Sequence, residues 1–302
     1  MSEIAMNKAK NIIEGYYDGK PLSDKFLRLH SFSRENQKDL LNLFEYRDSC
    51  KVLTCDDSSD QVFNLICHGC NDISVLSTNP FIAHYFELKK VVLQCLKQKE
   101  FLDFFYGTEK EGTISLFDQN IYNEISSEMR TGARRFWDYL FRKYDPSTIK
   151  SKLFLPDELS REQVINNNDY LNIEKFNSLK SRISDAQIMV YQDSLPILSY
   201  IESDYDLIFL SDYIERHLNL NEYNSYDLIM KIYIEFVKIV KSKLKNEGIM
   251  SYQYVRDAKN NYLDRLFDEY LSSISKRVYI PSASNIEGQV DGVYIIRKRT
   301  LK

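Results

Sequence analysis

Acidic, hydroxyl and amide side chains follow four β-rich segments of the sequence, each at the point where the segment ends. The group after residues 51–55 comprises Asp56, Asp57, Ser58, Ser59, Asp60 and Gln61. The later groups comprise Ser77 and Asn79, then Asp193 and Ser194, then Ser211, Asp212 and Tyr213. In an open parallel sheet, ligands bind beyond the carboxyl ends of the strands, where the strand order reverses. We therefore expect these groups to form one binding site.

The group after residues 205–210 offers acid–base chemistry. A carboxylate within hydrogen-bond reach of a substrate hydroxyl or amine can accept its proton. We therefore take Asp212, with Tyr213 beside it, as the candidate catalytic residues. The competing interpretation is that Asp212 caps the helix that carries Glu215 and His217.

Two other residues of this predicted site have a second interpretation as helix caps. Asp60 opens a helical segment, where it could orient the ammonium group of a ligand or complement the helix dipole. Asn79 precedes Pro80, a residue suited to the first helical position, so capping is the simpler account of Asn79.

The remaining candidates are a cysteine pair and two arginines. Cys67 and Cys70 have the spacing of zinc ligands, but no second close pair exists, so we predict no metal site. Instead we expect Cys67 to pack in the core and Gly69 to end a helix in the left-handed conformation. Arg130 and Arg134 lie four residues apart and could bind a substrate's phosphate or carboxylate, although a solvated helix face also explains them.

The segments that must position these residues alternate in type. The predicted strands are residues 51–55, 72–77, 187–191, 205–210, 249–255, 277–280 and 292–297. The predicted helices between them are residues 60–68, 79–97, 195–201 and 226–246. This alternation predicts an α/β, Rossmann-like fold with a mostly parallel, doubly wound sheet and a C-terminal antiparallel hairpin.

The alternation is interrupted once, which suggests a domain organisation. Residues 100–184 are mostly helical in pattern and are expected to form an inserted helical cap. Residues 50–99 and 185–302 would form the Rossmann-like core, and residues 1–49 an N-terminal helical segment.

Composition narrows the classes of function and the location. With 302 residues, 43% of them hydrophobic, the chain can bury a sizeable core. Its net charge of −4 gives no general basic field, so we expect no nucleic-acid partner. Five cysteines, an odd number, suit a reducing compartment, and no apolar run reaches the roughly 18 residues of a membrane span. We expect a cytoplasmic protein without a transmembrane segment.

Four stretches of the sequence resemble one known family. They are K-V-L-T-C-D-D-S-S-D-Q-V-F-N at Lys51–Asn64, S-T-N-P at Ser77–Pro80 with F-E-L-K at Phe86–Lys89, and Y-D-L-I-F-L-S-D at Tyr205–Asp212. In this order they resemble the S-adenosylmethionine:diacylglycerol 3-amino-3-carboxypropyl transferases of betaine-lipid synthesis and their uncharacterised bacterial methyltransferase-like relatives. Weaker likeness extends from about Phe32 to the C-terminal hairpin. The resemblance implies a class I methyltransferase fold and S-adenosylmethionine as cofactor.

The resemblance also implies roles for the candidate residues. The loop after the first strand would hold the aminoacyl end of the cofactor, a carboxylate after the second strand its ribose, and Asp193, with Ser194, its adenine amine. Ser211 lies where such proteins face the sulfonium. Glu35 and Asn36 match a pair that could close over the cofactor, although a solvated helix start explains them equally well.

Two departures from the family pattern concern the cofactor loop. No glycine lies between Gly19 and Gly69, whereas relatives carry glycine at the places of Asp56 and Ser59, where backbone can approach the ligand. Ser77 stands where relatives have the ribose carboxylate, which exchanges charge-assisted hydrogen bonds for neutral ones. Asp56 or Asp57 could supply that carboxylate from the neighbouring strand.

The sequence thus supports a transferase that moves a methyl or 3-amino-3-carboxypropyl group from S-adenosylmethionine to an oxygen or nitrogen acceptor. The acceptor would be a small molecule, a lipid or a glycan. The alternative is a non-catalytic binding module with a degenerate cofactor loop. A Rossmann enzyme for another nucleotide is a weaker alternative, because the G-x-G-x-x-G fingerprint is missing.

Overall fold

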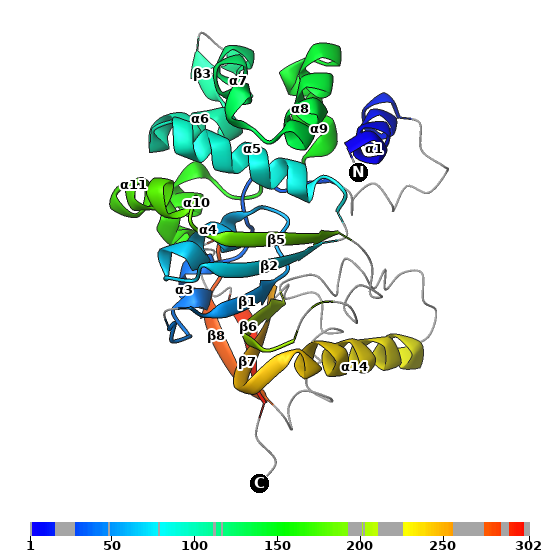
Figure 1. Cartoon of the computed structure of the whole chain (residues 1–302), viewed down its shortest axis with the longest axis vertical. Coiled ribbons are helices and arrows are strands. Elements are labelled where there is room, and N and C mark those ends of the chain that lie inside the picture. The colour runs from blue at the N-terminus through cyan, green and yellow to red at the C-terminus, as the bar shows by residue number, and fades with distance from the viewer. Residues whose placement is uncertain are drawn as a thin grey trace.

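The computed structural model describes most of the chain and is drawn in Figure 1. The described residues are 2–15, 28–47, 49–77, 79–110, 113–115, 117–192, 201, 203–210, 226–255, 275–284 and 290–298.

One large sheet organises the described residues. Its strands are β1 (Lys51–Thr54), β2 (Asp72–Ser77), β5 (Gln187–Gln192), β6 (Tyr205–Leu210), β7 (Leu244–Val255), β8 (Ser275–Pro281) and β9 (Val290–Arg297). The spatial order is β5-β2-β1-β6-β7-β9-β8. The first five are parallel to one another, and β9 pairs antiparallel with both β7 and β8. The predicted α/β, Rossmann-like fold of class I methyltransferases, with its closing hairpin, is confirmed.

Helices fill the connections between the strands. They are α1 (Ser2–Glu14), α3 (Gln37–Leu41), α4 (Asp60–Cys67), α5 (Ile82–Cys95), α6 (Gln98–Tyr106), α7 (Gln119–Ile125), α8 (Thr131–Lys143), α9 (Pro146–Leu153), α10 (Arg161–Asn167), α11 (Ile173–Arg182) and α14 (Tyr226–Ser242), with 3-10 turns η1 (Ser126–Glu128) and η2 (Asp169–Leu171). A small hairpin, β3 (Thr108–Lys110) and β4 (Thr113–Ser115), interrupts the segment predicted as helical.

The strand order fixes the edge at which a ligand binds. The chain runs outward from β1 to β2 and β5, then returns to the other side of β1 and continues through β6 to β7. Because such crossovers are right-handed, α4 and α5 cover one face of the sheet and α14 the other. The order therefore reverses between β1 and β6, beyond whose carboxyl ends doubly wound sheets bind ligands.

The strands of the parallel part are buried for a simple reason. In β1, β2 and β6 nearly every residue is buried, as expected of strands covered on both faces. The edge strand β5 is different, because its side chains are all partly or largely exposed. Gln187 and Met189 are exposed, whereas Ile188 and Val190, which alternate with them, are half-buried beside α5.

Some predicted boundaries were wrong. Helix α5 begins at Ile82 rather than at Pro80, because the Asn79 side chain accepts a hydrogen bond from the Phe81 backbone N–H at 2.9 Å and closes a turn ahead of the helix. Strand β7 begins at Leu244, which pairs with Tyr205, so sheet pairing ends the preceding helix earlier than predicted.

The expectation for Gly69 was right. Gly69 follows the end of α4 and has a φ of 99°, a backbone conformation that residues with a Cβ rarely adopt. The thiol of Cys67 is half-buried against the core, and no group of three metal-ligating side chains converges within the described residues.

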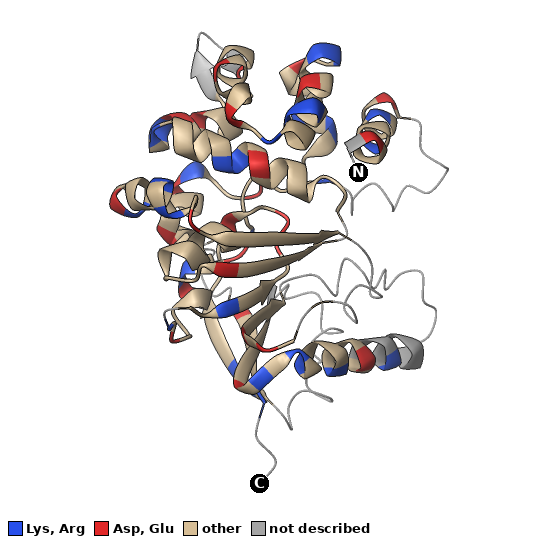
Figure 2. Cartoon of the chain, in the orientation of Figure 1, with Lys and Arg blue, Asp and Glu red and all other residues tan. Residues whose placement is uncertain are grey.

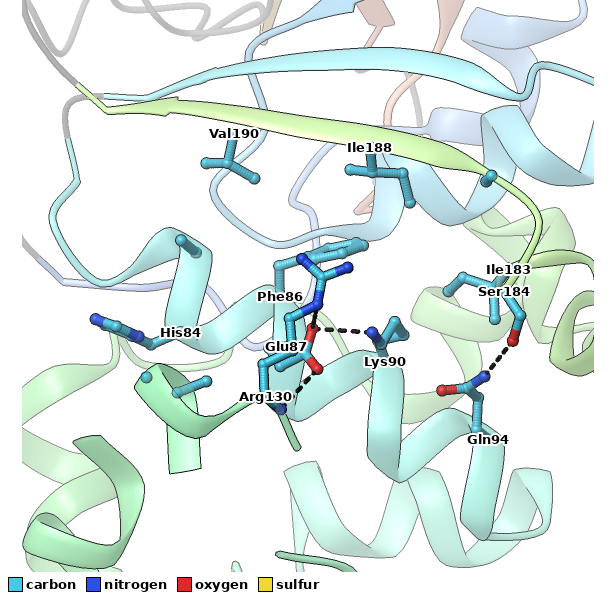
Figure 3. A pocket seen from close by; sticks show the side chains of 14 residues that line it. His84, Phe86, Glu87, Lys90, Gln94, Arg130, Ile183, Ser184, Ile188 and Val190 are labelled. Carbon is cyan, nitrogen blue, oxygen red and sulfur yellow. Dashed lines mark hydrogen bonds and ion pairs between the residues drawn. The ribbon is translucent and has the colours of Figure 1, made fainter. Parts of the chain in front are cut away.

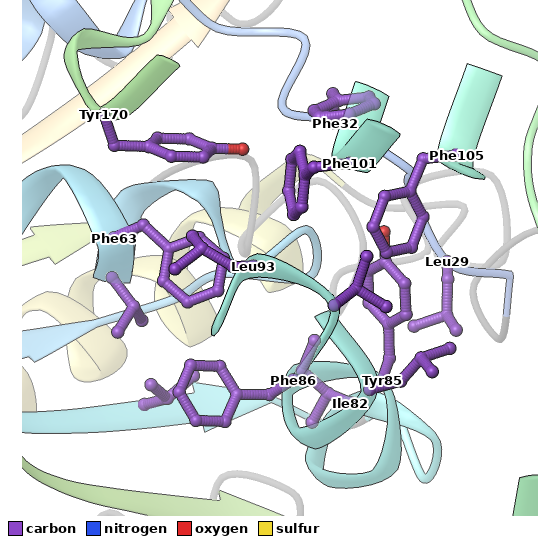
Figure 4. Packing of buried hydrophobic residues seen from close by; sticks show 14 of the residues in the cluster. Leu29, Phe32, Phe63, Ile82, Tyr85, Phe86, Leu93, Phe101, Phe105 and Tyr170 are labelled. Carbon is purple, nitrogen blue, oxygen red and sulfur yellow. The ribbon is translucent and has the colours of Figure 1, made fainter. Parts of the chain in front are cut away.

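A cluster of aromatic side chains joins α4 and α5 to segments on either side of them in the sequence. Phe32 packs edge-on against Phe101 and Phe105, with ring centroids 6.2 and 6.0 Å apart, and Tyr170 packs against Phe63 at 5.3 Å (Figure 4). Edge-to-face pairs at these distances add to the free energy gained from burial. The segment before β1 and the helices after α5 therefore share one hydrophobic cluster with the Rossmann-like elements.

Charged side chains concentrate on the outer helices, while the strands are mostly uncharged (Figure 2). Asp60 and Lys89 depart from this distribution, since both side chains are fully buried. No helix in the described ranges has the length and apolar character needed to cross a membrane.

Candidate functional site

The loop between β1 and α4 lies at the edge where the strand order reverses. The end of β2 reaches this loop, where the Ser77 hydroxyl contacts Asp57. Asp193, Ser194, Ser211, Asp212 and Tyr213 lie outside the described residues.

Asp56 organises the backbone of this loop. One of its carboxylate oxygens accepts from the N–H groups of Ser58 and Ser59, both at 2.8 Å, and from the Ser58 hydroxyl at 2.9 Å. The other accepts from the Val62 N–H at 3.2 Å, in the first turn of α4. Asp56 therefore satisfies N–H groups at the start of α4 that have no partner within the helix.

The pKa of Asp56 is shifted by its surroundings. Burial, together with the negative charge of Asp60, raises the pKa of the Asp56 carboxyl to about 6, against the opposing effect of the hydrogen bonds from Ser58. The ionised form of Asp56 therefore costs folding free energy near neutral pH.

Asp60 does not act as the N-cap of α4; it is bound by a buried lysine. Lys89, on α5, donates from Nζ to Asp60 Oδ1 at 2.5 Å. The same ammonium donates to the backbone carbonyls of Ser31 and Ser58 at 2.6 and 2.7 Å, and lies 4.4 Å from the centroid of the Phe32 ring. Burial lowers the pKa of Lys89, whereas the charge of Asp60 raises it. All three ammonium protons have acceptors, which is the condition for burying a charge.

The Asp60 carboxylate has two further partners from distant parts of the chain. The Tyr170 hydroxyl donates to Oδ1 at 2.6 Å, and the Ser33 backbone N–H donates to Oδ2 at 2.5 Å. Burial and the charge of Asp60 raise the pKa of Tyr170, which keeps its hydroxyl protonated as a donor. Asp60 therefore joins η2 and the segment before α3 to the candidate site, and its carboxylate is already occupied within the protein.

Asp57 places a carboxylate at the end of β2. The Ser77 hydroxyl donates to Asp57 Oδ1 at 2.6 Å, and Ser77 Oγ in turn accepts from the Asn79 N–H at 3.0 Å. The Asp57 side chain is half-buried. The sequence left open whether Asp56 or Asp57 could stand in for the carboxylate missing at Ser77; in the structure, Asp57 lies beside Ser77 and Asp56 caps the loop.

Ser59 has a left-handed backbone conformation, with φ 70° and ψ 0°. This is one of the two places at which the family that the sequence resembles carries glycine. The Ser59 hydroxyl is buried, and so is the Gln61 side-chain N–H₂ group; neither has a hydrogen-bond partner among the described residues. Gln61 uses its carbonyl oxygen to accept from the Thr54 hydroxyl. The loop therefore adopts a glycine-like path without glycine and leaves two polar groups unpaired.

Glu35 and Asn36 lie near the start of α4 but have other partners. Asn36 caps α3 by accepting from the Asp39 N–H at 3.0 Å and also donates to the Pro281 carbonyl. Glu35 accepts from the Gln37 amide at 2.9 Å and is buried. A role for this pair in closing over a cofactor stays a prediction.

The structure does not bring Arg130 and Arg134 to the loop of β1. The Nε atom of Arg134 lies 3.7 Å from Oδ2 of Asp138 on the exposed face of α8. Arg130 precedes α8 and lines a separate cavity between α5, α8 and β5, with its Nε 3.8 Å from Glu87. Their binding of a substrate stays a prediction.

Sequence reasoning did not identify Lys89 and Tyr170. Lys89 belongs to the F-E-L-K stretch, and its neighbours Leu88, Val91 and Val92 are apolar and buried. A lysine within an apolar helix face is the signal that could have indicated a buried ion pair.

Solved structures with a similar fold are known, although no protein-family model and no curated protein matches by sequence. Among solved structures, the chain is similar to the N-methyltransferase NodS from Bradyrhizobium japonicum WM9 in complex with S-adenosyl-L-homocysteine, with a TM-score of 0.41 and 9% identity over 98% of this chain and 99% of that one. It is similar to the rRNA methyltransferase aviRa from Streptomyces viridochromogenes, with a TM-score of 0.38 and 10% identity over 87% and 82% of the two chains. Spermidine synthase from Thermotoga maritima gives a TM-score of 0.40 and 9% identity over 88% and 60%. The fold assignment rests on the strand order and not on these similarities.

The conformation of Ser59 leads to a first prediction. We expect Ser59→Gly to raise the free energy of unfolding by about 1 kcal/mol, because glycine adopts positive φ without the cost that a Cβ incurs. Ser59→Ala also removes the unpaired hydroxyl but keeps the Cβ, so it serves as the matched control and should be less stable than Ser59→Gly. Urea unfolding measures both variants, and an alanine variant as stable as the glycine variant would contradict the assigned backbone conformation.

The shifted pKa of Asp56 leads to a second prediction, whose sign follows from linkage. Because the folded-state pKa of about 6 lies above the ordinary value of 3.8, the stabilising protonated form is lost as pH rises through about 6. The unfolding free energy of the unchanged protein, relative to Asp56→Asn, should therefore fall by roughly 3 kcal/mol between about pH 4 and pH 8. If the difference in unfolding free energy between the unchanged protein and Asp56→Asn does not change between these pH values, the pKa of Asp56 is not raised.

Proposed function

We propose that the chain is an S-adenosylmethionine-dependent transferase that moves a methyl or 3-amino-3-carboxypropyl group to an oxygen or nitrogen acceptor. The observation that carries this proposal is the Asp57 carboxylate hydrogen-bonded to Ser77 at the end of β2, beside the point where the strand order reverses. The sequence resemblance implies a ribose carboxylate at this place, and Asp57 supplies one from the neighbouring loop.

The residues present fit such a cofactor in two respects. Asp57 can accept from ribose hydroxyls through charge-assisted hydrogen bonds, which are stronger than those Ser77 alone could make. The unpaired Ser59 hydroxyl lies in the loop that would face the aminoacyl end, and the unpaired Gln61 amide lies in the first turn of α4 beside it. Buried polar groups without partners are rare in proteins, so a ligand that pairs with them would account for both.

The chemistry requires little covalent participation by the protein. When bound, the cofactor supplies an electrophilic carbon attached to a sulfonium. The acceptor's oxygen or nitrogen forms a bond to that carbon as the carbon–sulfur bond breaks, and the acceptor's proton passes to a base, for which we propose Asp212 with Tyr213 beside it. The site works mainly by aligning these atoms and excluding water. Transfer of methyl leaves S-adenosylhomocysteine, and transfer of aminocarboxypropyl leaves methylthioadenosine.

A second candidate function, a non-catalytic binding module, has an observation in its favour. The N–H groups of Ser58, Ser59 and Val62, which could otherwise hold an anionic part of a ligand, already donate to Asp56. The protein's own carboxylate thus occupies the start of α4. The two functions differ in whether the cofactor binds and turns over.

Calorimetric titration with S-adenosylmethionine, S-adenosylhomocysteine and methylthioadenosine tests the proposal. We expect a micromolar dissociation constant for S-adenosylmethionine in the unchanged protein. In Asp57→Asn the dissociation constant should rise about tenfold, because a neutral amide replaces a charge-assisted acceptor.

Asp72→Asn is the matched control, since Asp72 is a half-buried aspartate at the opposite end of β2. It should bind the cofactor as the unchanged protein does. If none of the three compounds binds at millimolar concentration, the transferase proposal is wrong and the binding module is favoured. If all bind but Asp57→Asn has no effect, the role assigned to Asp57 is wrong.

A further inference from the structure

A cavity of about 600 Å³ lies between α5, the start of α8 and the edge strand β5 (Figure 3). Its volume falls within the range of small-molecule sites. Its apolar walls include Phe86 on α5 and Ile188 and Val190 on β5. The half-buried face of β5 that carries Ile188 and Val190 thus forms one wall of a cavity on the side of the sheet that α5 covers. The mechanism proposed above makes no use of this cavity.

The charged groups of the cavity converge from two helical elements. Glu87 is buried, and its carboxylate accepts from Lys90 Nζ at 2.9 Å and from the Arg130 backbone N–H at 3.1 Å. These bonds attach the start of α8 to α5 and leave the Arg130 guanidinium only distantly paired, with Nε 3.8 Å from Glu87 and 82% of the side chain exposed. In Figure 3 the guanidinium points toward Ile188 and Val190.

The remaining polar groups add no charge. Burial lowers the pKa of His84 to about 4, so its ring, which stacks on Phe136 with centroids 4.6 Å apart, is neutral near pH 7. At the other end of the cavity the Gln94 amide donates to the Ser184 hydroxyl at 2.9 Å and closes the wall (Figure 3). One carboxylate therefore faces two cations, and the lining carries a net positive charge.

We propose that this cavity binds a small amphipathic anion, an apolar ring system that carries one carboxylate, sulfonate or phosphate group. The anionic group pairs with the Arg130 guanidinium, which can donate two parallel hydrogen bonds to such a group. The apolar body packs against Phe86, Ile188 and Val190. The site is independent of the cofactor loop and of the proposed transferase activity.

The chain offers a position at which the cavity can be filled without backbone strain. Gly132 lines the cavity in the first turn of α8, and a Cβ built on it meets no atom within 4 Å. We therefore use Gly132→Phe to add a ring at the cavity wall while a helix-compatible backbone is kept.

Fluorescence titration with 8-anilinonaphthalene-1-sulfonate, an aromatic sulfonate, tests the proposal. We expect saturable binding with one dye per chain. Arg130→Gln should weaken binding about tenfold, since it removes a charge-assisted pair. Gly132→Phe should weaken it at least as much. N-phenyl-1-naphthylamine, which lacks the sulfonate, should bind more weakly than the dye and should not respond to Arg130→Gln.

Arg142→Gln is the matched control, because Arg142 lies in the last turn of α8, the helix that Arg130 precedes, is 78% exposed and pairs with Asp138 outside the cavity. It should bind the dye as the unchanged protein does. Absence of saturable binding to the unchanged protein would overturn the proposal. So would equal binding by the Arg130→Gln, Gly132→Phe and Arg142→Gln variants.

Discussion

The buried ion pair between Lys89 and Asp60 is the interaction on which the candidate site depends. Both side chains are fully removed from solvent, and each makes three hydrogen bonds that span the N-terminal segment, the loop after β1 and η2. A buried charge without such partners would cost several kcal/mol, so the arrangement is stable only when all partners are in place. The pair therefore fixes three distant segments relative to the carboxyl edge of the sheet.

This constraint explains how the loop after β1 holds its course without glycine. Lys89 holds the Ser58 carbonyl, Asp56 collects the N–H groups that follow, and Ser59 accepts a left-handed conformation between them. Backbone strain of this kind persists only when the surroundings over-determine it. Asp57 is thereby directed toward Ser77 and the end of β2. Hydrogen bonds from polar side chains thus stabilise a loop conformation that other proteins reach with glycine. As a consequence, several backbone N–H groups of this loop already donate to Asp56.

The sequence was sufficient for features that depend on local pattern. Alternating strand and helix signals predicted the parallel sheet and its closing hairpin, because buried parallel strands are nearly continuous apolar runs. Gly69 was predicted to end α4 because few other residues adopt its φ. Features set by distant contacts could not be predicted: the partner of Asp60 is 29 positions away on α5, and the start of β7 depends on pairing with β6. Which of Asp56 and Asp57 lies beside Ser77 likewise depends on the loop's three-dimensional course.

The most direct test of this account is a double-mutant cycle on the buried pair, measured by urea unfolding with Lys89→Met, Asp60→Asn and the double variant. Removal of one partner should cost about 3–5 kcal/mol, because the other charge stays buried without compensation, and the double variant should lose less than the sum of the single variants. Lys238→Met, which breaks the exposed pair with Glu235, is the control and should cost less than about 1 kcal/mol. If Lys89→Met costs no more than this control, or if the two single changes add, the buried pair is not the constraint that holds the site together.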